Sequence, residues 1–272
     1  KGMNIPVERV LSGCAANVID AAIENNQAEY WNALLSETPG AIIQNQGPIQ
    51  YGLTGLPHPL FNLVTRTRLE GAETAARVEQ TIREIRGFRL PFGWVVGPLS
   101  RPPDLPRFLE SHGLHVGVRL PGMAMDLCVA RPSDPAKDVE EVLDLEGLDQ
   151  WMIPCLTAFD MSRDAAEWFR LAHAGLGFGE GAPLRLFVGR DQLRPAACSL
   201  LYFGAGVAGL YCVGTLLEAR RQGFGAAMVE ACLQAARGAG YKIAILHSAP
   251  MGHNLYRRLG FKDYCTLTVY VD

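Results

Sequence analysis

Two arginines and two glycines stand directly before a long amphipathic helix in the second half of the chain, where residues 219–226 read ARRQGFGA. Glycine is about 1 kcal/mol less favourable than alanine in a helix, so two glycines at a helix start need a reason. Helix N-termini carry unpaired N–H donors and the positive end of the helix dipole, which together bind anions. Gly223 and Gly225 would let a phosphate approach these donors, and Arg220 and Arg221 add positive charge. The stretch predicts a diphosphate site; the alternative is a solvated basic turn with incidental glycines.

A second glycine motif, GAGVAG at residues 204–209, satisfies the G-x-G-x-x-G pattern of dinucleotide-binding proteins. In those proteins a helix opens inside the motif, whereas the LYCVGTLL that follows here favours a strand. We therefore interpret GAGVAG as a hairpin turn rather than a Rossmann site. The surrounding run from Pro195 to Leu217 has 23 residues without a charge, which is long enough for a membrane span. Its central glycines divide it into two short apolar runs, so we expect a pair of strands instead.

The same order of elements occurs in both halves of the chain. Each half is expected to end in a helix, a strand, a short helix and a further strand, which indicates two copies of one unit. The predicted ranges are 71–87, 92–98, 103–113 and 115–120 in the first half, and 218–240, 241–247, 250–260 and 261–271 in the second. A linker with two prolines is predicted at residues 131–138, which gives domains at 3–130 and 139–272.

Composition restricts the possible functions. A chain of 272 residues with 49% hydrophobic and 19% charged residues has the material for buried cores. The formal net charge of -3 disfavours a nucleic-acid partner. Seven cysteines without a C-x-x-C pair fit a reducing compartment, so we expect a cytoplasmic location, and the six histidines show no metal-binding spacing.

Two stretches together resemble the GCN5-related N-acetyltransferase (GNAT) superfamily. RRQGFGAA, at residues 220–227, is similar to the R/Q-x-x-G-x-G/A motif, with Arg220, Gly223 and Gly225 at its fixed positions. LYRRLGF at residues 255–261 resembles the L-Y-x-x-x-G-F signature. The two occur in the family's order, and the resemblance covers about residues 139–272. It implies an α/β (α+β) fold of two GNAT-like domains, each a mixed, mostly antiparallel twisted sheet flanked by helices. The first half carries neither motif and is interpreted as a degenerate copy.

The resemblance implies acetyl-CoA, or another acyl-CoA, as co-substrate, with no metal. In this family a strand before the motif diverges from its neighbour, and the pantetheine arm lies in the gap. Backbone groups of Val213, Gly214 and Thr215 would then bind the arm and the thioester. The residues that would surround the pyrophosphate are Arg220, Arg221, Gln222, Gly223, Phe224, Gly225 and Ala226.

Tyr256 matches the family tyrosine whose hydroxyl donates a proton to the departing CoA thiolate. The alternative is a core aromatic residue with a locally satisfied hydroxyl. Where the family often has an Asn that contacts CoA, this chain has Ala249, preceded by Ser248. His247 is either a proton relay or a histidine held by local hydrogen bonds, and Glu218 is interpreted as a solvated carboxylate at a helix start.

We therefore expect an acyl-CoA-dependent N-acyltransferase that transfers an acetyl or other acyl group directly to an amine of a small molecule or peptide. The first half would support the substrate pocket or an interface, and the protein would be a monomer or homodimer without nucleic-acid or membrane partners. Two alternatives stay open: a non-catalytic acyl-CoA-binding regulatory protein, and an enzyme that uses the same fold for another thioester reaction, such as decarboxylation.

Overall fold

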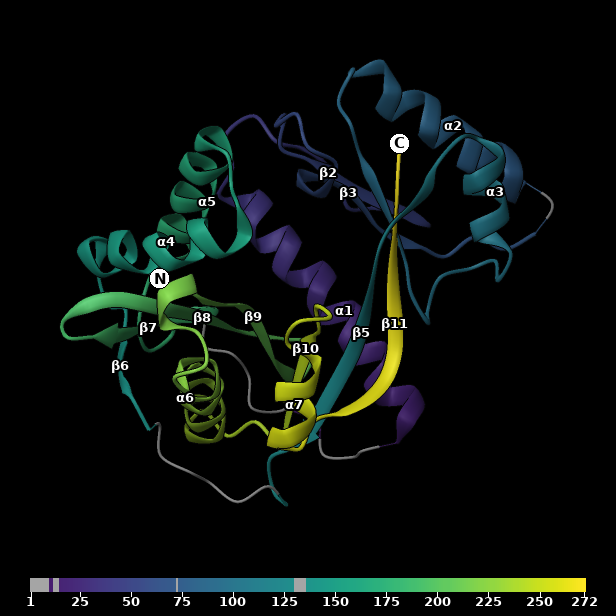
Figure 1. The fold of residues 1–272 in the computed structure, drawn as a ribbon. Helices are drawn as coiled ribbons and strands as arrows, with labels where there is room; N and C mark the ends of the chain where they lie inside the picture. The colour runs from purple at the N-terminus through teal and green to yellow at the C-terminus, as the bar shows by residue number, and fades with distance from the viewer. Residues whose placement is uncertain (1–9, 12–14, 72, 130–135) are drawn as a thin grey trace. The chain divides into compact units, whose positions relative to one another are not determined.

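The computed structural model describes residues 10–11, 15–71, 73–129 and 136–272 (Figure 1). By its internal contacts the chain forms two compact units. Unit 1 comprises residues 1–37 and 122–264, and unit 2 comprises residues 38–121 and 265–272. Each unit is a mixed, mostly antiparallel sheet flanked by helices, which confirms the predicted fold class. The predicted linker lies largely outside the described residues, as does the start of the predicted first domain.

Unit 1 is built on a sheet in which the strand order is β5-β10-β9-β8-β7-β6. Its strands are β6 (Asp138–Glu141), β7 (Leu184–Asp191), β8 (Arg194–Gly204), β9 (Val207–Thr215), β10 (Ile243–His247) and the last part of β5 (His115–Asp126). Only β9 and β10 run parallel to each other; the other neighbouring pairs are antiparallel. Unit 1 therefore contains a single pair of adjacent strands, β9 and β10, that run in the same direction.

Helices cover both faces of this sheet (Figure 1). One face carries α4 (Leu145–Phe159), α5 (Arg163–Leu176) and α1 (Ala16–Ser36), and the other carries α6 (Phe224–Gly238) with α7 (His253–Leu259) beside it. Asp144 and Ser162 accept hydrogen bonds from backbone N–H groups at the starts of α4 and α5, as good N-cap residues do. Trp151 of α4 donates its indole N–H to the carbonyl of Ser199, 2.9 Å away, and so fixes that helix on β8.

The long uncharged run of the sequence forms the β8–β9 hairpin, so that prediction is confirmed. Gly204 pairs with Val207, and the two residues between them, Ala205 and Gly206, have φ of 50° and 73°. Two left-handed residues in a two-residue loop match the twist of a hairpin. Because helices cover both faces, nearly every side chain of β8 is buried, which explains the absence of charges. No helix among the described residues is long and apolar enough to cross a membrane.

Unit 2 repeats this plan on a smaller scale, with strand order β1-β2-β3-β4-β11-β5. Its elements are β1 (Ile42–Gln44), β2 (Ile49–Leu53), β3 (Asn62–Thr67), α2 (Thr74–Gly87), β4 (Gly93–Val96), α3 (Leu105–Ser111), the first part of β5 and most of β11 (Lys262–Val271). The β3–β4 pair is parallel, as the β9–β10 pair is in unit 1. Val78, Ile82 and Ile85 of α2 form one apolar stripe that packs over Trp94 in the core. The internal repetition expected from the sequence is confirmed.

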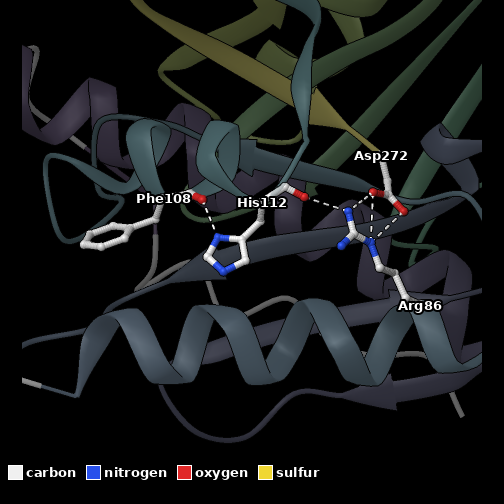
Figure 2. Close-up of polar contacts among 4 residues, drawn as sticks. All are labelled: Arg86, Phe108, His112 and Asp272. Carbon is white, nitrogen blue, oxygen red and sulfur yellow. Dashed lines mark hydrogen bonds and ion pairs between the residues drawn. The ribbon is translucent and has the colours of Figure 1, made fainter.

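An arginine ties the chain terminus to two helices of unit 2 (Figure 2). The Arg86 guanidinium contacts the Asp272 carboxylate through Nε and Nη2, at 3.1 Å and 2.5 Å from Oδ1. Its Nη2 also donates to the carbonyl of His112, at 2.8 Å, and His112 Nδ1 lies 2.7 Å from the carbonyl of Phe108. The ion pair raises the pKa of Arg86. This fork-shaped contact fixes the end of β11 to α2 and to the C-terminus of α3.

The two halves of the sequence exchange their last strands. Residues 122–126 of β5, at the end of the first half, pair with β10, and residues 268–271 of β11, at the end of the second half, pair with β4. Helix α1 also packs on β8 and β9. The compact units therefore do not follow a division of the chain at residues 131–138, because strand exchange and α1 carry parts of each half into the other unit.

Candidate functional site

The β9 strand has a bulge at the start of the predicted cofactor-binding stretch. Its pairing with β8 shifts register between Tyr211, which faces Leu200, and Gly214, which faces Cys198. Cys212 has a φ of 50°, which is rare for a residue with a side chain. A bulge re-aims the residues that follow it and is common next to functional sites. Here it precedes Val213, the first of the three residues predicted to bind the pantetheine arm.

The pairing between the parallel strands β9 and β10 ends just before this bulge. The two strands pair at three positions, the last being Leu210 with Leu246, although β9 continues to Thr215. Gly214 and Thr215 pair with Cys198 and Ala197 of β8 on one side only, and Val213 lies within the bulge between the paired positions. Their other edge presents backbone N–H and C=O groups of the kind that bind an extended ligand as if it were an added strand. This is the strand divergence that the family resemblance implies.

A loop of unusual backbone conformation joins β9 to α6. After a short 3-10 turn at Leu217–Ala219, Arg221 and Gly223 have φ of 62° and 91°. Gly223 is the N-cap residue, and no side chain caps this helix. The first helical bond runs from the Ala227 N–H to the Gly223 carbonyl, so the N–H groups of residues 224–226 have no partner within the helix. An uncapped N-terminus of a long helix is a favourable position for a phosphate.

The two glycines have different structural reasons. Gly223 needs the left-handed conformation, which side chains disfavour. A Cβ on Gly225 would lie 3.1 Å from Cδ2 of Leu255, so the absence of a side chain also lets α7 approach α6. The reason predicted from the sequence for both glycines was that they let a phosphate approach the backbone. Gly225 therefore also places the helix that carries Tyr256 close to the loop.

The other side chains of the loop turn back on the backbone. Arg220 Nε donates to the carbonyl of Thr215, at 3.2 Å, and Gln222 Nε2 donates to the carbonyl of Glu218, at 2.8 Å. Arg221 is exposed. The two hydrogen bonds stabilise the conformation of the loop.

The structure adds one cation that sequence reasoning missed. Lys137 Nζ lies 4.9 Å from the centroid of the Phe224 ring, and its Cε would be 3.9 Å from a Cβ on Gly223. The cation therefore stands at the N-terminus of α6, over the first residue of the helix, where a cation over a ring is stabilised. The residue lies in the predicted linker, and nothing in the local sequence links it to the glycine loop. Lys137 adds positive charge at the N-terminus of α6.

Tyr256 lies on α7 and is 8% exposed. Its ring packs edge-on against Phe261, and Gly252 allows it to lie close, since a Cβ there would be 2.7 Å from the ring. Burial, with a smaller contribution from Cys232, raises the pKa of Tyr256 to about 12. The hydroxyl makes no hydrogen bond to another described residue. Tyr256 therefore keeps its proton at neutral pH and has that proton available for a ligand.

Two residues at the end of β10 differ in their hydrogen bonding. Ser248 is fully buried and donates its hydroxyl to the carbonyl of Ala249, at 2.9 Å. The hydroxyl proton of Ser248 is therefore already paired within the loop. His247 has a buried Nε2 without a hydrogen-bond partner, and burial lowers its pKa to about 4.

The corresponding position of unit 2 differs in charge from the loop before α6. Gly71 has a φ of 89° and α2 begins at Thr74, which parallels the loop before α6. Glu73 is the N-cap residue of α2. Glu73 makes no side-chain capping hydrogen bond, but its negative charge at the helix N-terminus disfavours the binding of another anion. No cluster of His, Cys, Asp and Glu suited to a metal ion occurs among the described residues of either unit.

Comparison with known families agrees with the motifs. Residues 183–263 match the model of the acetyltransferase (GNAT) domain, which confirms the resemblance. The matched segment includes the bulge, the glycine loop and Tyr256. No protein of curated function matches the sequence significantly.

Solved structures match nearly the whole chain. A GCN5-related N-acetyltransferase from Kribbella flavida has a TM-score of 0.65 at 22% identity, over 90% of this chain and 95% of that one. A tandem GNAT protein from the clavulanic acid biosynthesis pathway has a TM-score of 0.62 at 14% identity, over 95% and 96%. A GCN5-related N-acetyltransferase from Sphaerobacter thermophilus has a TM-score of 0.58 at 16% identity, over 97% and 94%. The chain therefore has the tandem GNAT fold.

Proposed function

We propose that unit 1 binds acetyl-CoA and transfers the acetyl group directly to an amine of a small molecule or peptide. The GNAT fold supports acyl-CoA-dependent acetyl transfer in general. The observation that carries the proposal is the combination of a diverging parallel strand pair with an uncapped helix N-terminus, both on the same strand–loop–helix segment.

Each part of a CoA thioester has a matching feature. The pyrophosphate would accept hydrogen bonds from the N–H groups of residues 224–226, with Lys137 and Arg221 supplying charge. The pantetheine arm, which has amide groups, would pair with the free edge of residues 213–215. Oriented N–H groups at that edge would also polarise the thioester carbonyl.

The amine would attack this carbonyl without a cysteine intermediate. Cys232 is fully buried and its pKa is raised to about 12, mainly by burial, so its thiol is a poor nucleophile. Tyr256 would protonate the thiolate as the C–S bond breaks. Its raised pKa keeps the proton on the phenol until a strongly basic thiolate develops beside it.

Thioester turnover provides the test. Acetyl-CoA, propionyl-CoA and malonyl-CoA are each incubated with the protein, with and without a polyamine, an amino sugar and a lysine-containing peptide, and products are identified by mass spectrometry. The proposal expects amine-dependent loss of the acetyl group, slowed by Tyr256→Phe. Amine-independent loss of carbon dioxide from malonyl-CoA would favour the decarboxylase alternative, and binding of acetyl-CoA without any product would favour a regulatory protein.

A further inference from the structure

His247 stands where β9 and β10 separate. It is the last residue of β10, one position beyond the final β9–β10 pair between Leu210 and Leu246. On its other side it pairs with Gly122 of β5, so its backbone position is fixed by the sheet. The side chain therefore lies at the edge of the strand opening that would receive the thioester.

The imidazole points to the face of the sheet opposite Tyr256. Ala244 and Leu246 belong to the core that packs under α6 and contains Tyr256. Side chains alternate along a strand, so His247 lies on the other face, and its ring centroid is 6.0 Å from that of Tyr211. An acid for the leaving thiolate and an acceptor for the amine proton are needed on different sides of the reacting carbonyl. Tyr256 and His247 have that placement.

A buried imidazole nitrogen without a partner is unusual in this protein. Nε2 of His247 has no hydrogen-bond partner among the described residues. The hydroxyl of Tyr211 is not available to it, because that hydroxyl donates to Asn26 Oδ1. His173, which is fully buried, uses both nitrogens: Nε2 lies 2.9 Å from the Tyr30 hydroxyl and Nδ1 lies 2.6 Å from the Phe169 carbonyl. An unsatisfied buried polar group costs stability, which is commonly tolerated where a ligand or water completes the site.

We propose that His247 accepts the amine proton in the acetyl transfer described above, and this inference rests on that function. The amine nitrogen forms the C–N bond, and its proton passes to Nε2 of His247 directly or through one water. The C–S bond then breaks, and the thiolate takes the proton of the Tyr256 hydroxyl. The products are the acetylated amine and free CoA, and the imidazolium and tyrosinate return to their starting states by proton exchange with solvent.

The partly buried position of His247 keeps its imidazole neutral. Its pKa is lowered to about 4, so the imidazole is neutral at pH 7 and has a lone pair to offer. Such an imidazole is a weak base, so it accepts the proton only after the C–N bond has formed, when the ammonium of the tetrahedral adduct is more acidic than a free ammonium ion. It also releases the proton readily after each turnover.

The position of His247 beside the bound thioester can be tested without knowing the amine acceptor. Protein labelled with ¹⁵N-histidine is titrated with acetyl-CoA, and the imidazole resonances are assigned by single variants. We expect the His247 resonances to shift and those of His173 to stay in place, since both of its nitrogens are occupied. Binding of acetyl-CoA that leaves the His247 resonances unchanged would overturn the inference while leaving the proposed function intact. Failure of acetyl-CoA to bind at all would remove the proposed function instead.

The chemical role is tested by kinetics with the most rapidly acetylated amine of the panel, or with hydroxylamine when none of them is acetylated. His247→Gln keeps the approximate volume, and we expect a loss of about 10²-fold in kcat with unchanged affinity for CoA. Added imidazole should restore part of the activity of His247→Ala. The matched control is His58→Gln, whose side chain is exposed in unit 2. A kcat for His247→Gln equal to that of the control would contradict the assignment, as would a loss explained by weaker CoA binding alone.

Discussion

The hydroxyl of Tyr211, on β9, donates a 2.7 Å hydrogen bond to Oδ1 of Asn26, on α1. The same amide donates through Nδ2 to the carbonyl of Gly204, at 2.9 Å. Asn26 is fully buried, and Gly209 leaves room for it, since a Cβ there would overlap its oxygen. One side chain from the start of the chain therefore ties α1 to both strands of the hairpin that leads to the candidate site.

Asn26→Ala should destabilise unit 1. The change removes the part-buried hydrogen bonds of Asn26 with Tyr211 and Gly204, which costs roughly 2–4 kcal/mol in the free energy of unfolding. Urea denaturation followed by circular dichroism measures the effect. Asn25→Ala, at the neighbouring and less buried position, is the control and should cost much less. Equal losses in the two variants would show that the Asn26 contacts contribute little.

Gly223→Ala should destabilise the protein because of its φ of 91°. Forcing a side chain into the left-handed region costs roughly 1–2 kcal/mol. Gly238→Ala is the matched control at the other end of α6, where an added Cβ meets nothing within 4 Å. It should stabilise the helix slightly, because alanine is the better helix former. The account of the loop would be wrong if both variants changed stability in the same direction by the same amount.

Asp272→Asn should loosen the end of β11. It removes the ionic part of the contact with Arg86, whose side chain is 43% exposed, so the loss should be at most about 1 kcal/mol in low salt and smaller in high salt. Hydrogen exchange of the β11 amides gives a local readout. The control is Glu79→Gln, which removes the partner of Arg83 on the surface of α2. Unchanged exchange in Asp272→Asn would show that the strand is held by its sheet pairing alone.

Stability should fall as the pH is lowered from about 6.5 to about 4. His173 and His247 are neutral when folded, because burial lowers both pKa values to about 4, whereas the unfolded chain takes up these protons below about 6.5. The stabilisation is complete above pH 6.5, and it is lost toward pH 4 with a slope of up to about 2.7 kcal/mol per pH unit for the two groups. His173→Gln should be less stable at pH 7 but should show a shallower slope. If the stability of His173→Gln fell with decreasing pH as steeply as that of His58→Gln, this explanation would be contradicted.

The sequence predicted the elements of unit 1 and the position of the loop well, because local patterns determine both. The uncharged run, the turn at Ala205 and the helix after Gly223 each follow from neighbouring residues. The bond between Asn26 and Tyr211 spans 185 positions, and no local pattern indicates it. Lys137 was missed for the same reason. The exchange of β5 and β11 was also not foreseeable, since an alternating strand pattern does not specify which neighbour the strand will pair with.

Isothermal titration calorimetry with CoA measures whether the loop before α6 binds the diphosphate of CoA. The account predicts that the wild-type protein binds CoA and that Lys137→Glu weakens binding about tenfold, because the variant places a negative charge beside the pyrophosphate. Lys242→Glu makes the same charge change at an exposed position of unit 1 and should bind CoA like the wild type. Absence of CoA binding by the wild-type protein, or equal weakening in the two variants, would contradict binding of the diphosphate by this loop.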